Sequence, residues 1–217
     1  FPDIRIVPVY AARMQIQAML DIGRPGLAEI GFATDDPAIL VNLSGEEQDG
    51  LVEDLAARIQ WPGTDVPAVC LLDTGVNRGH PLIEPALSPE DVQALLDDWQ
   101  GDDHYPGQGH GTRMAGLALH GDLTGPLADQ SLPILRHRLE SVKFLPPTPR
   151  DDDDLANYGA ITQAAVALAE ERQPDRRRTI CSATTNAGRR GDRPTRWSAA
   201  IDEIAAGVDA AEGEEPP

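Results

Sequence analysis

The nine residues VCLLDTGVN (residues 69–77) decide the fold of this chain. With Ala68 they open on the apolar run AVCLL, which lacks the alternation of a strand that has one face in water. Such a run is typical of a parallel-sheet strand buried on both faces. It ends at Asp73, followed by Thr74 and Gly75. Functional side chains gather at the carboxyl ends of strands in doubly wound sheets, so Asp73 is a candidate site residue.

Strands and helices alternate along the chain after this run. Residues 139–144 and TICSATT (residues 179–185) predict strands. Helical patterns occupy LSPEDVQALLDDW, HGTRMAGLALHG, YGAITQAAVALAEERQ and TRWSAAIDEIAAGVDAA, at residues 87–99, 110–121, 158–173 and 195–211. This alternation predicts an α/β fold with a doubly wound, mostly parallel sheet.

The first 65 residues differ from this pattern. IRIVPVY (residues 4–10) and LAEIGFAT (residues 27–34) alternate like half-buried strands. SGEEQDGLVEDLAARI (residues 44–59) predicts a helix that begins with a capping box. The turn-rich QWPGTDVP follows. We therefore predict a small N-terminal α+β appendage with its linker over residues 1–65, and a main α/β domain over residues 66–217.

The composition narrows the choice of partners. Asp and Glu number 36 against 18 Lys and Arg, which gives a net charge of −18. Such a chain repels phosphate backbones, so we predict no nucleic-acid partner. No stretch approaches the apolar length of a membrane span, so no membrane partner is predicted either. The two cysteines, Cys70 and Cys181, are expected to be buried and reduced. The compartment stays open, with the cytoplasm favoured over secretion.

A second motif, HGTRMAG (residues 110–116), opens a helix with a histidine followed by small residues. Together with DTGVNRGHP (residues 73–81), it resembles the subtilisin-like serine peptidases, whose Asp-[Ser/Thr]-Gly and His-Gly-Thr-x-x-Ala-Gly motifs occur in this order. The resemblance extends over roughly residues 66–213. It implies a subtilisin-like fold that is incomplete at its C-terminal side.

Asp-Thr-Gly also occurs in pepsin-like and retroviral peptidases, where two copies supply carboxylates that share a proton. This chain has one copy in βαβ surroundings, and an aspartic mechanism would leave the HGTRMAG stretch unexplained. The resemblance instead implies peptide hydrolysis by an Asp–His–Ser triad, in which Asp73 orients His110 and His110 acts on a serine. It also implies a polypeptide substrate, paired with the strand edge at Ala183, Thr184 and Thr185.

The nucleophile motif of that family, Gly-Thr-Ser-x-Ala, is absent from this sequence. Ser198 lies near a predicted helix start, where a capping or first-turn role is expected. Asn186 lacks the order expected of an oxyanion residue and is assigned to a loop. We expect the chain to stop before the strand that carries the oxyanion residue. The parent protein would be a serine endopeptidase, and this chain alone would be inactive without its C-terminal half. The alternative is a catalytically inactive interaction module.

No metal and no cofactor are predicted. Several residues offer zinc-type ligands, but their spacing matches no tight ligand pattern. These residues are His80, Asp102, Asp103, His104 and His110. Calcium is common in subtilisin-like enzymes, and DDDD (residues 151–154) offers hard oxygens, yet consecutive acids cannot all point at one ion. The resemblance leaves two roles for residues 1–65, a prodomain-like unit or an accessory unit.

Overall fold

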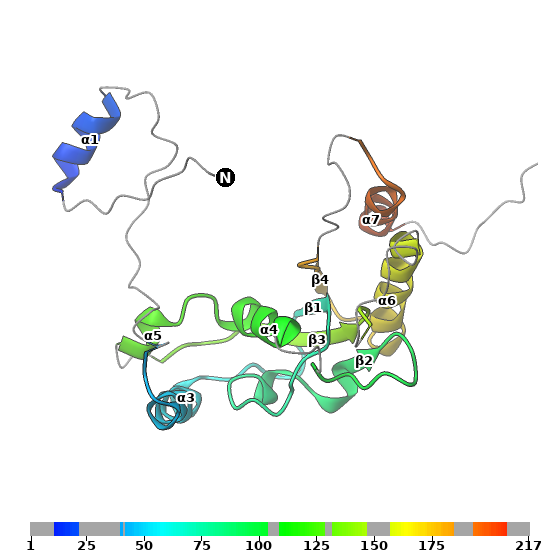
Figure 1. Ribbon diagram of the computed structural model, residues 1–217, viewed down its shortest axis with the longest axis horizontal. Coiled ribbons are helices and arrows are strands. Elements are labelled where there is room, and N and C mark those ends of the chain that lie inside the picture. The colour runs from blue at the N-terminus through cyan, green and yellow to red at the C-terminus, as the bar shows by residue number, and fades with distance from the viewer. Residues whose placement is uncertain are drawn as a thin grey trace, which may run out of the picture. The chain divides into compact units, whose positions relative to one another are not determined.

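The computed structural model describes residues 11–21, 40, 42–103, 109–128, 132–146, 157–184 and 193–207 (Figure 1). The chain forms two compact units, Phe1–Asn42 and Leu43–Pro217. In the first unit the structure describes helix α1 (Arg13–Asp21), which the sequence pattern does not predict. The strands predicted over residues 4–10 and 27–34 lie outside the described residues.

Within the described residues, the second unit is built on a sheet of parallel strands. These are β1 (Ala68–Asp73), β2 (Val92–Ala94), β3 (Arg138–Lys143) and β4 (Arg178–Cys181). Their order is β2-β3-β1-β4, so β1 lies between β3 and β4, as its apolar run requires. The predicted α/β fold with a parallel sheet is confirmed.

Helices cover both faces of this sheet. Successive side chains of β1 point to opposite faces. Leu71 packs with Ala115 of helix α4 (His110–His120). Cys70 and Leu72 pack with Ala165 of helix α6 (Tyr158–Arg172), and helix α7 (Arg196–Ala206) lies against α6 (Figure 1). Asp73 shares the strand face of Leu71, which is the face that α4 covers.

The helix predicted at residues 44–59 is α3 (Gly45–Arg58), and it begins with the predicted capping box of Ser44 and Glu47. Its buried Leu55 joins a cluster with Leu82, and short helix α5 (Thr124–Ala128) lies beside α3. Because Leu82 belongs to the main body, this contact places α3 in the second unit. The compact units therefore divide after residue 42, whereas the sequence places the boundary after residue 65.

The prediction of a helix over residues 87–99 is wrong. The structure has a 3-10 turn η1 (Glu84–Ala86), a second turn η2 (Pro89–Asp91) and then strand β2. Val92 pairs with Ser141 of β3, and Ala94 pairs with Lys143. Backbone pairing at the sheet edge thus overrides the helical periodicity of this segment. The remaining predicted helices, at α4, α6 and α7, are present.

Both cysteines are free thiols. Cys70 is buried on the α6 face, and burial raises the pKa of its thiol to about 12. Cys181 pairs in register with Leu71 and packs in the cluster on the α4 face. The two thiols therefore point to opposite faces of the sheet. Within the described residues, no helix combines the length and the apolarity needed to cross a membrane.

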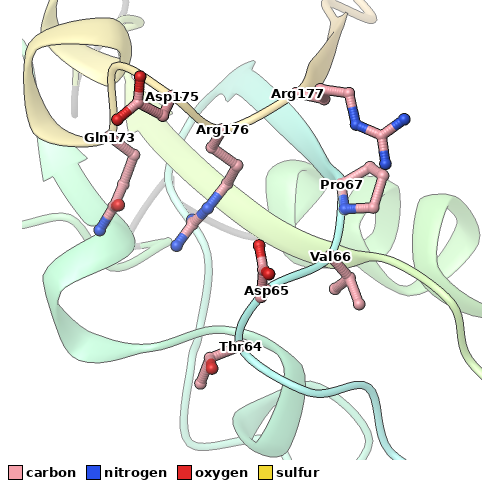
Figure 2. A pocket seen from close by; sticks show the side chains of 8 residues that line it. All are labelled: Thr64, Asp65, Val66, Pro67, Gln173, Asp175, Arg176 and Arg177. Atoms are coloured by element: carbon pink, nitrogen blue, oxygen red, sulfur yellow. The ribbon is translucent and has the colours of Figure 1, made fainter.

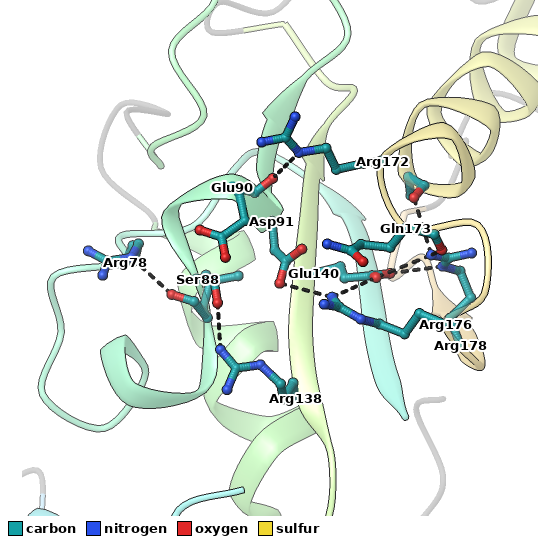
Figure 3. Close-up of polar contacts among 12 residues, drawn as sticks. Arg78, Ser88, Glu90, Asp91, Arg138, Glu140, Arg172, Gln173, Arg176 and Arg178 are labelled. Carbon is teal, nitrogen blue, oxygen red and sulfur yellow. Dashed lines mark hydrogen bonds and ion pairs between the residues drawn. The ribbon is translucent and has the colours of Figure 1, made fainter. Parts of the chain in front are cut away.

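A buried ion cluster links β3 to β4 on the α6 face (Figure 3). Glu140, only 2% exposed, accepts hydrogen bonds from Arg176 Nη1 and Arg178 Nε, each at 2.9 Å. The same Arg176 nitrogen donates to Asp91 of η2 at 2.9 Å. Two acids and two bases balance, and buried charges persist only when they are paired in this way. The cluster fixes β3, β4 and η2 relative to one another.

One contact of α4 makes stability depend on pH. Burial, with smaller effects of His80 and His137, lowers the pKa of His120 below its ordinary value of 6.5. His120 Nε2 contacts the Leu82 carbonyl oxygen at 2.6 Å, and the neutral ring donates this bond. A histidine with a lowered folded-state pKa takes up fewer protons when folded than when unfolded, so stability falls as the pH drops below 6.5.

We therefore expect the free energy of unfolding to decrease between pH 7 and pH 5, as measured by urea denaturation. The variant His120→Gln keeps an N–H for Leu82 but does not titrate, so its decrease should be smaller. An equal decrease in both proteins would assign the pH dependence to other groups.

Candidate functional site

Asp73 ends the central strand of the sheet, and its side chain is almost fully buried. Asp73 as a whole is only 1% exposed. The Thr74 amide donates to Asp73 Oδ1 at 2.7 Å, which fixes one carboxylate oxygen. The Asp73 carbonyl accepts from the amides of Phe144 and Leu145, at 3.1 and 3.3 Å, so the end of β1 is tied to the chain after β3. The carboxylate is thus held rigidly at the carboxyl end of the sheet.

His110 is the first residue of α4 and faces Asp73. Its Nδ1 lies 2.8 Å from Asp73 Oδ1 and 3.0 Å from Oδ2. Because a carboxylate only accepts, Nδ1 carries a proton, and in the neutral ring Nε2 is then the acceptor. The His110 side chain is 38% exposed against 2% for Asp73. In the described part of the chain no group hydrogen-bonds to Nε2, so a partly exposed imidazole with an unpaired ring nitrogen contacts a buried acid.

The start of α4 is capped by residues from other parts of the chain. Its N-cap, Gly109, has a φ of 53° and provides no side-chain cap. Instead, the Gly111 amide donates to Thr74 Oγ1 at 3.0 Å, and the Thr112 amide donates to Asp103 Oδ2 at 2.8 Å. The Thr74 hydroxyl in turn donates to Asp103 Oδ1 at 2.9 Å. First-turn amides need such acceptors, and a carboxylate is favoured at this end of a helix.

Two glycines allow β1 and α4 to meet this closely. A Cβ on Gly111 would lie 2.1 Å from the Gly75 carbonyl oxygen. A Cβ on Gly75 would lie 2.5 Å from the Gly101 carbonyl oxygen, and the φ of Gly75 is 99°, a region that side chains disfavour. The Gly in each motif is therefore required by close backbone contact around the Asp73–His110 pair.

The other predicted site residues have different positions. Ala183 and Thr184 follow Ser182, beyond the end of β4 at Cys181, so the strand is shorter than the one predicted over residues 179–185. Thr184 Oγ1 lies 3.0 Å from Ser182 Oγ. Thr185 and Asn186 lie outside the described residues. Ser198 is in the first turn of α7, where its amide donates to the Thr195 hydroxyl at 3.1 Å. The structural role expected for Ser198 is the one that it has.

The residues considered as metal ligands are engaged elsewhere or lie apart. His80 Nδ1 accepts from the Leu82 amide at 3.2 Å, and Asp103 belongs to the cap of α4. His104 and residues 151–154 lie outside the described residues. Where the chain is described, no group of three or more His, Cys, Asp or Glu side chains is arranged to hold a metal ion.

A separate pocket of about 240 Å³ lies at the other end of the sheet (Figure 2). It is formed by residues 64–67, just before β1, and by residues 173–177, just before β4. Two acids and two arginines line it, Asp65, Asp175, Arg176 and Arg177. Their charges balance, and Arg176 is already bound to Glu140 and Asp91. Because the pocket lies before the first residues of β1 and β4, whereas Asp73 is the last residue of β1, the pocket is distinct from the site at Asp73.

Sequence reasoning missed two residues that build this site. Asp103 was considered only as a metal ligand, and Lys143 was not considered. Lys143 is 2% exposed and donates from Nζ to the Asp102 carbonyl oxygen at 2.6 Å. The available signal was the position of Asp103 seven residues before His110, together with the lysine at the end of an apolar strand. Both roles depend on contacts between segments far apart in sequence.

The fold and the site define a doubly wound α/β protein with an Asp–His pair at the carboxyl end of its central strand. The chain belongs to the subtilase family, a family of serine proteases, because the model described as "Subtilase family" matches residues 64–214. The resemblance seen in the two motifs is thereby confirmed. No curated protein matches the chain. No solved structure matches it either.

The contact between α4 and β1 can be tested with two alanine variants of one helix. Gly111→Ala should lower the free energy of unfolding by about 1–3 kcal/mol, because its Cβ overlaps the Gly75 carbonyl. Gly116→Ala is the matched control, since a Cβ there meets nothing within 4 Å. It should raise stability by about 0.5–1 kcal/mol through helix propensity. Urea denaturation of both variants checks this, and equal effects would contradict the close contact.

Proposed function

We propose that this chain supplies the Asp and His of a subtilisin-type serine endopeptidase, whose substrate is a polypeptide. The observation that carries the proposal is the 2.8 Å contact between His110 Nδ1 and a buried Asp73 carboxylate. In this arrangement Asp73 holds the imidazole in the tautomer that leaves Nε2 unprotonated. Family membership adds the reaction class, which is acyl transfer by a serine.

The geometry suits general acid–base catalysis by His110. Nε2 would take the proton of a serine hydroxyl as that oxygen attacks the peptide carbonyl. The resulting imidazolium would be stabilised by the Asp73 carboxylate, which the Thr74 amide keeps in place. The same Nε2 proton would then pass to the leaving amine. Burial of Asp73 strengthens this stabilisation, because water does not screen the interaction.

The nucleophile is proposed to come from residues outside this sequence. No Gly-Thr-Ser-x-Ala motif is present in the 217 residues. Ser198 belongs to α7, which packs on α6, whereas His110 begins the helix on the other face. In the described sheet β4 is an edge strand, so its outer edge offers backbone groups to a further strand. We propose a C-terminal half of the same domain as the partner for this edge of β4.

A polypeptide substrate is proposed to bind in extended form near Ala183, Thr184 and Thr185. Support comes from the position of Ala183 and Thr184, which continue the chain at the carboxyl end of β4. Asp73 lies at the carboxyl end of neighbouring β1, since Leu71 pairs with Cys181. Substrate backbone added along this segment would therefore lie at the same end of the sheet as the Asp–His pair.

The absence of the nucleophile motif also favours a second candidate, an inactive interaction module that keeps the fold without the chemistry. The two candidates differ in what the complete gene product does. An aspartic peptidase has less support. Among the described residues, the Asp73 carboxylate is hydrogen-bonded by His110 and the Thr74 amide rather than by a second carboxylate. That mechanism predicts an acid optimum and inhibition by a statine-type compound.

The test compares the 217-residue chain with the complete product of its gene, using casein cleavage and labelling by a serine-directed phosphonate. We expect cleavage and labelling by the complete product and neither by the 217-residue chain. Asp73→Asn in the complete product should lower kcat by about 10⁴-fold, because the wrong tautomer is then favoured. His110→Ala should abolish labelling, whereas His80→Ala, in the exposed GHP segment, should leave activity unchanged.

Each other outcome has a distinct meaning. Stoichiometric labelling of Ser198 in the short chain would show that the nucleophile is present after all. A complete product that neither cleaves casein nor reacts with the phosphonate would reject the peptidase function and favour the interaction module.

A further inference from the structure

We infer that Asp103 is a positioning residue that sets the geometry of the Asp73–His110 pair through the hydroxyl of Thr74. In the described structure the hydrogen bonds of the Asp103 carboxylate go to Thr74 and Thr112, not to Asp73 or His110. It acts on the residues next to them in the chain, Thr74 beside Asp73 and Thr112 close to His110. The relevance of this inference to catalysis rests on the function proposed above, but the positioning itself does not.

The Asp103 carboxylate joins two segments through three hydrogen bonds. Oδ1 accepts from the Thr74 hydroxyl at 2.9 Å. Oδ2 accepts from both the amide and the hydroxyl of Thr112, each at 2.8 Å. The Thr112 hydroxyl oxygen also accepts from the Asn77 amide at 3.0 Å. Asp103 is 6% exposed, so these bonds are made largely away from water and hold both segments to one carboxylate.

The segment that carries Asp103 is itself fixed to the sheet. The Val76 amide donates to the Gly101 carbonyl at 3.1 Å, and Lys143 Nζ donates to the Asp102 carbonyl at 2.6 Å. Lys143 is the register partner of Asp73 in β3, so its side chain starts from the same end and face of the sheet. Asp103 is therefore held in place relative to β1 by contacts that do not involve α4.

Thr74 transmits this position to both members of the pair. Its amide donates to the Asp73 carboxylate at 2.7 Å, and its hydroxyl oxygen accepts from the Gly111 amide at 3.0 Å. The Thr74 hydroxyl has one proton and donates it in a hydrogen bond to Asp103, so a lone pair of the hydroxyl oxygen is left to accept from the Gly111 amide. Without Asp103 the Thr74 hydroxyl is free to rotate. The end of β1 and the start of α4 are then no longer held to the same carboxylate. Displacements of about 1 Å cost roughly 10²-fold in rate.

The test uses the 217-residue chain labelled with ¹⁵N-histidine and reads the deshielded proton of His110 Nδ1 by NMR. This proton is seen only while the bond to Asp73 protects it from exchange with water. Thr74→Val removes the hydroxyl at nearly constant volume, and Thr74→Ser restores it. We expect the resonance in the wild-type and Thr74→Ser chains, and its loss in Thr74→Val and Asp103→Asn.

The matched control is Asp122→Asn. Asp122 also accepts from the amide and the hydroxyl of one threonine, Thr124, but at an exposed turn before α5. It should keep the His110 resonance. Thermal unfolding establishes that each variant is folded. Thr112→Val is the second variant, for use if Thr74→Val does not fold. It removes the Thr112 hydroxyl, which donates to Asp103 and accepts from the Asn77 amide, but keeps the bond from the Thr112 amide to Asp103. It should broaden the His110 resonance.

A resonance that persists in folded Thr74→Val and Asp103→Asn, or is absent from the wild-type chain, would overturn the inference. In the complete gene product, Thr74→Val should lower kcat by roughly 10²-fold with little change in KM, and Thr74→Ser should not. If the complete product has no peptidase activity while the resonance responds as expected, the proposed function fails and the positioning role stands. If activity is present but neither the His110 resonance nor kcat changes in Thr74→Val, only the positioning role fails.

Discussion

The Gly111 amide donates to the Thr74 hydroxyl at 3.0 Å, and at this bond the helix that carries His110 meets the strand that carries Asp73. The bond forms only because two backbone segments approach without side chains between them. A Cβ at Gly111 would collide with the Gly75 carbonyl, and a Cβ at Gly75 with the Gly101 carbonyl. The requirement for glycine at both places follows from this packing, whatever chemistry the site performs.

The sheet holds the site in place through an ion cluster on the face opposite to Asp73. On the α6 face Glu140 pairs with Arg176 and Arg178, and this cluster ties the outer strand β4 to β3 across β1. Breaking a buried pair leaves an uncompensated charge and costs about 3–5 kcal/mol, so the strands resist sliding relative to one another. Asp73, on the opposite face, therefore keeps its place in the register with Lys143.

The sequence was sufficient for the features that local patterns encode. The run that ends at Asp73 predicts a strand buried on both faces, and the small residues after His110 predict a helix that packs closely. It was insufficient where a distant segment decides the outcome. Residues 92–94 carry a helical periodicity, yet they pair with β3 because a free strand edge lies beside them. The position of Asp103 seven residues before His110 does not reveal its role, because that role is defined by Thr74 and Thr112.

The N-termini of the helices also differ in whether local or distant residues cap them. Helices α3 and α7 each begin with a capping box. The side chains that accept from their first-turn amides are therefore close in sequence, and the cap can be predicted from the sequence. Helix α4 has Gly109 at its N-cap, and Thr74 and Asp103 supply the acceptors instead. The first turn of α4 is therefore stable only when the strand end and the loop before it are in place. Since His110 lies in that turn, the residue proposed as the base becomes ordered together with the acid that orients it.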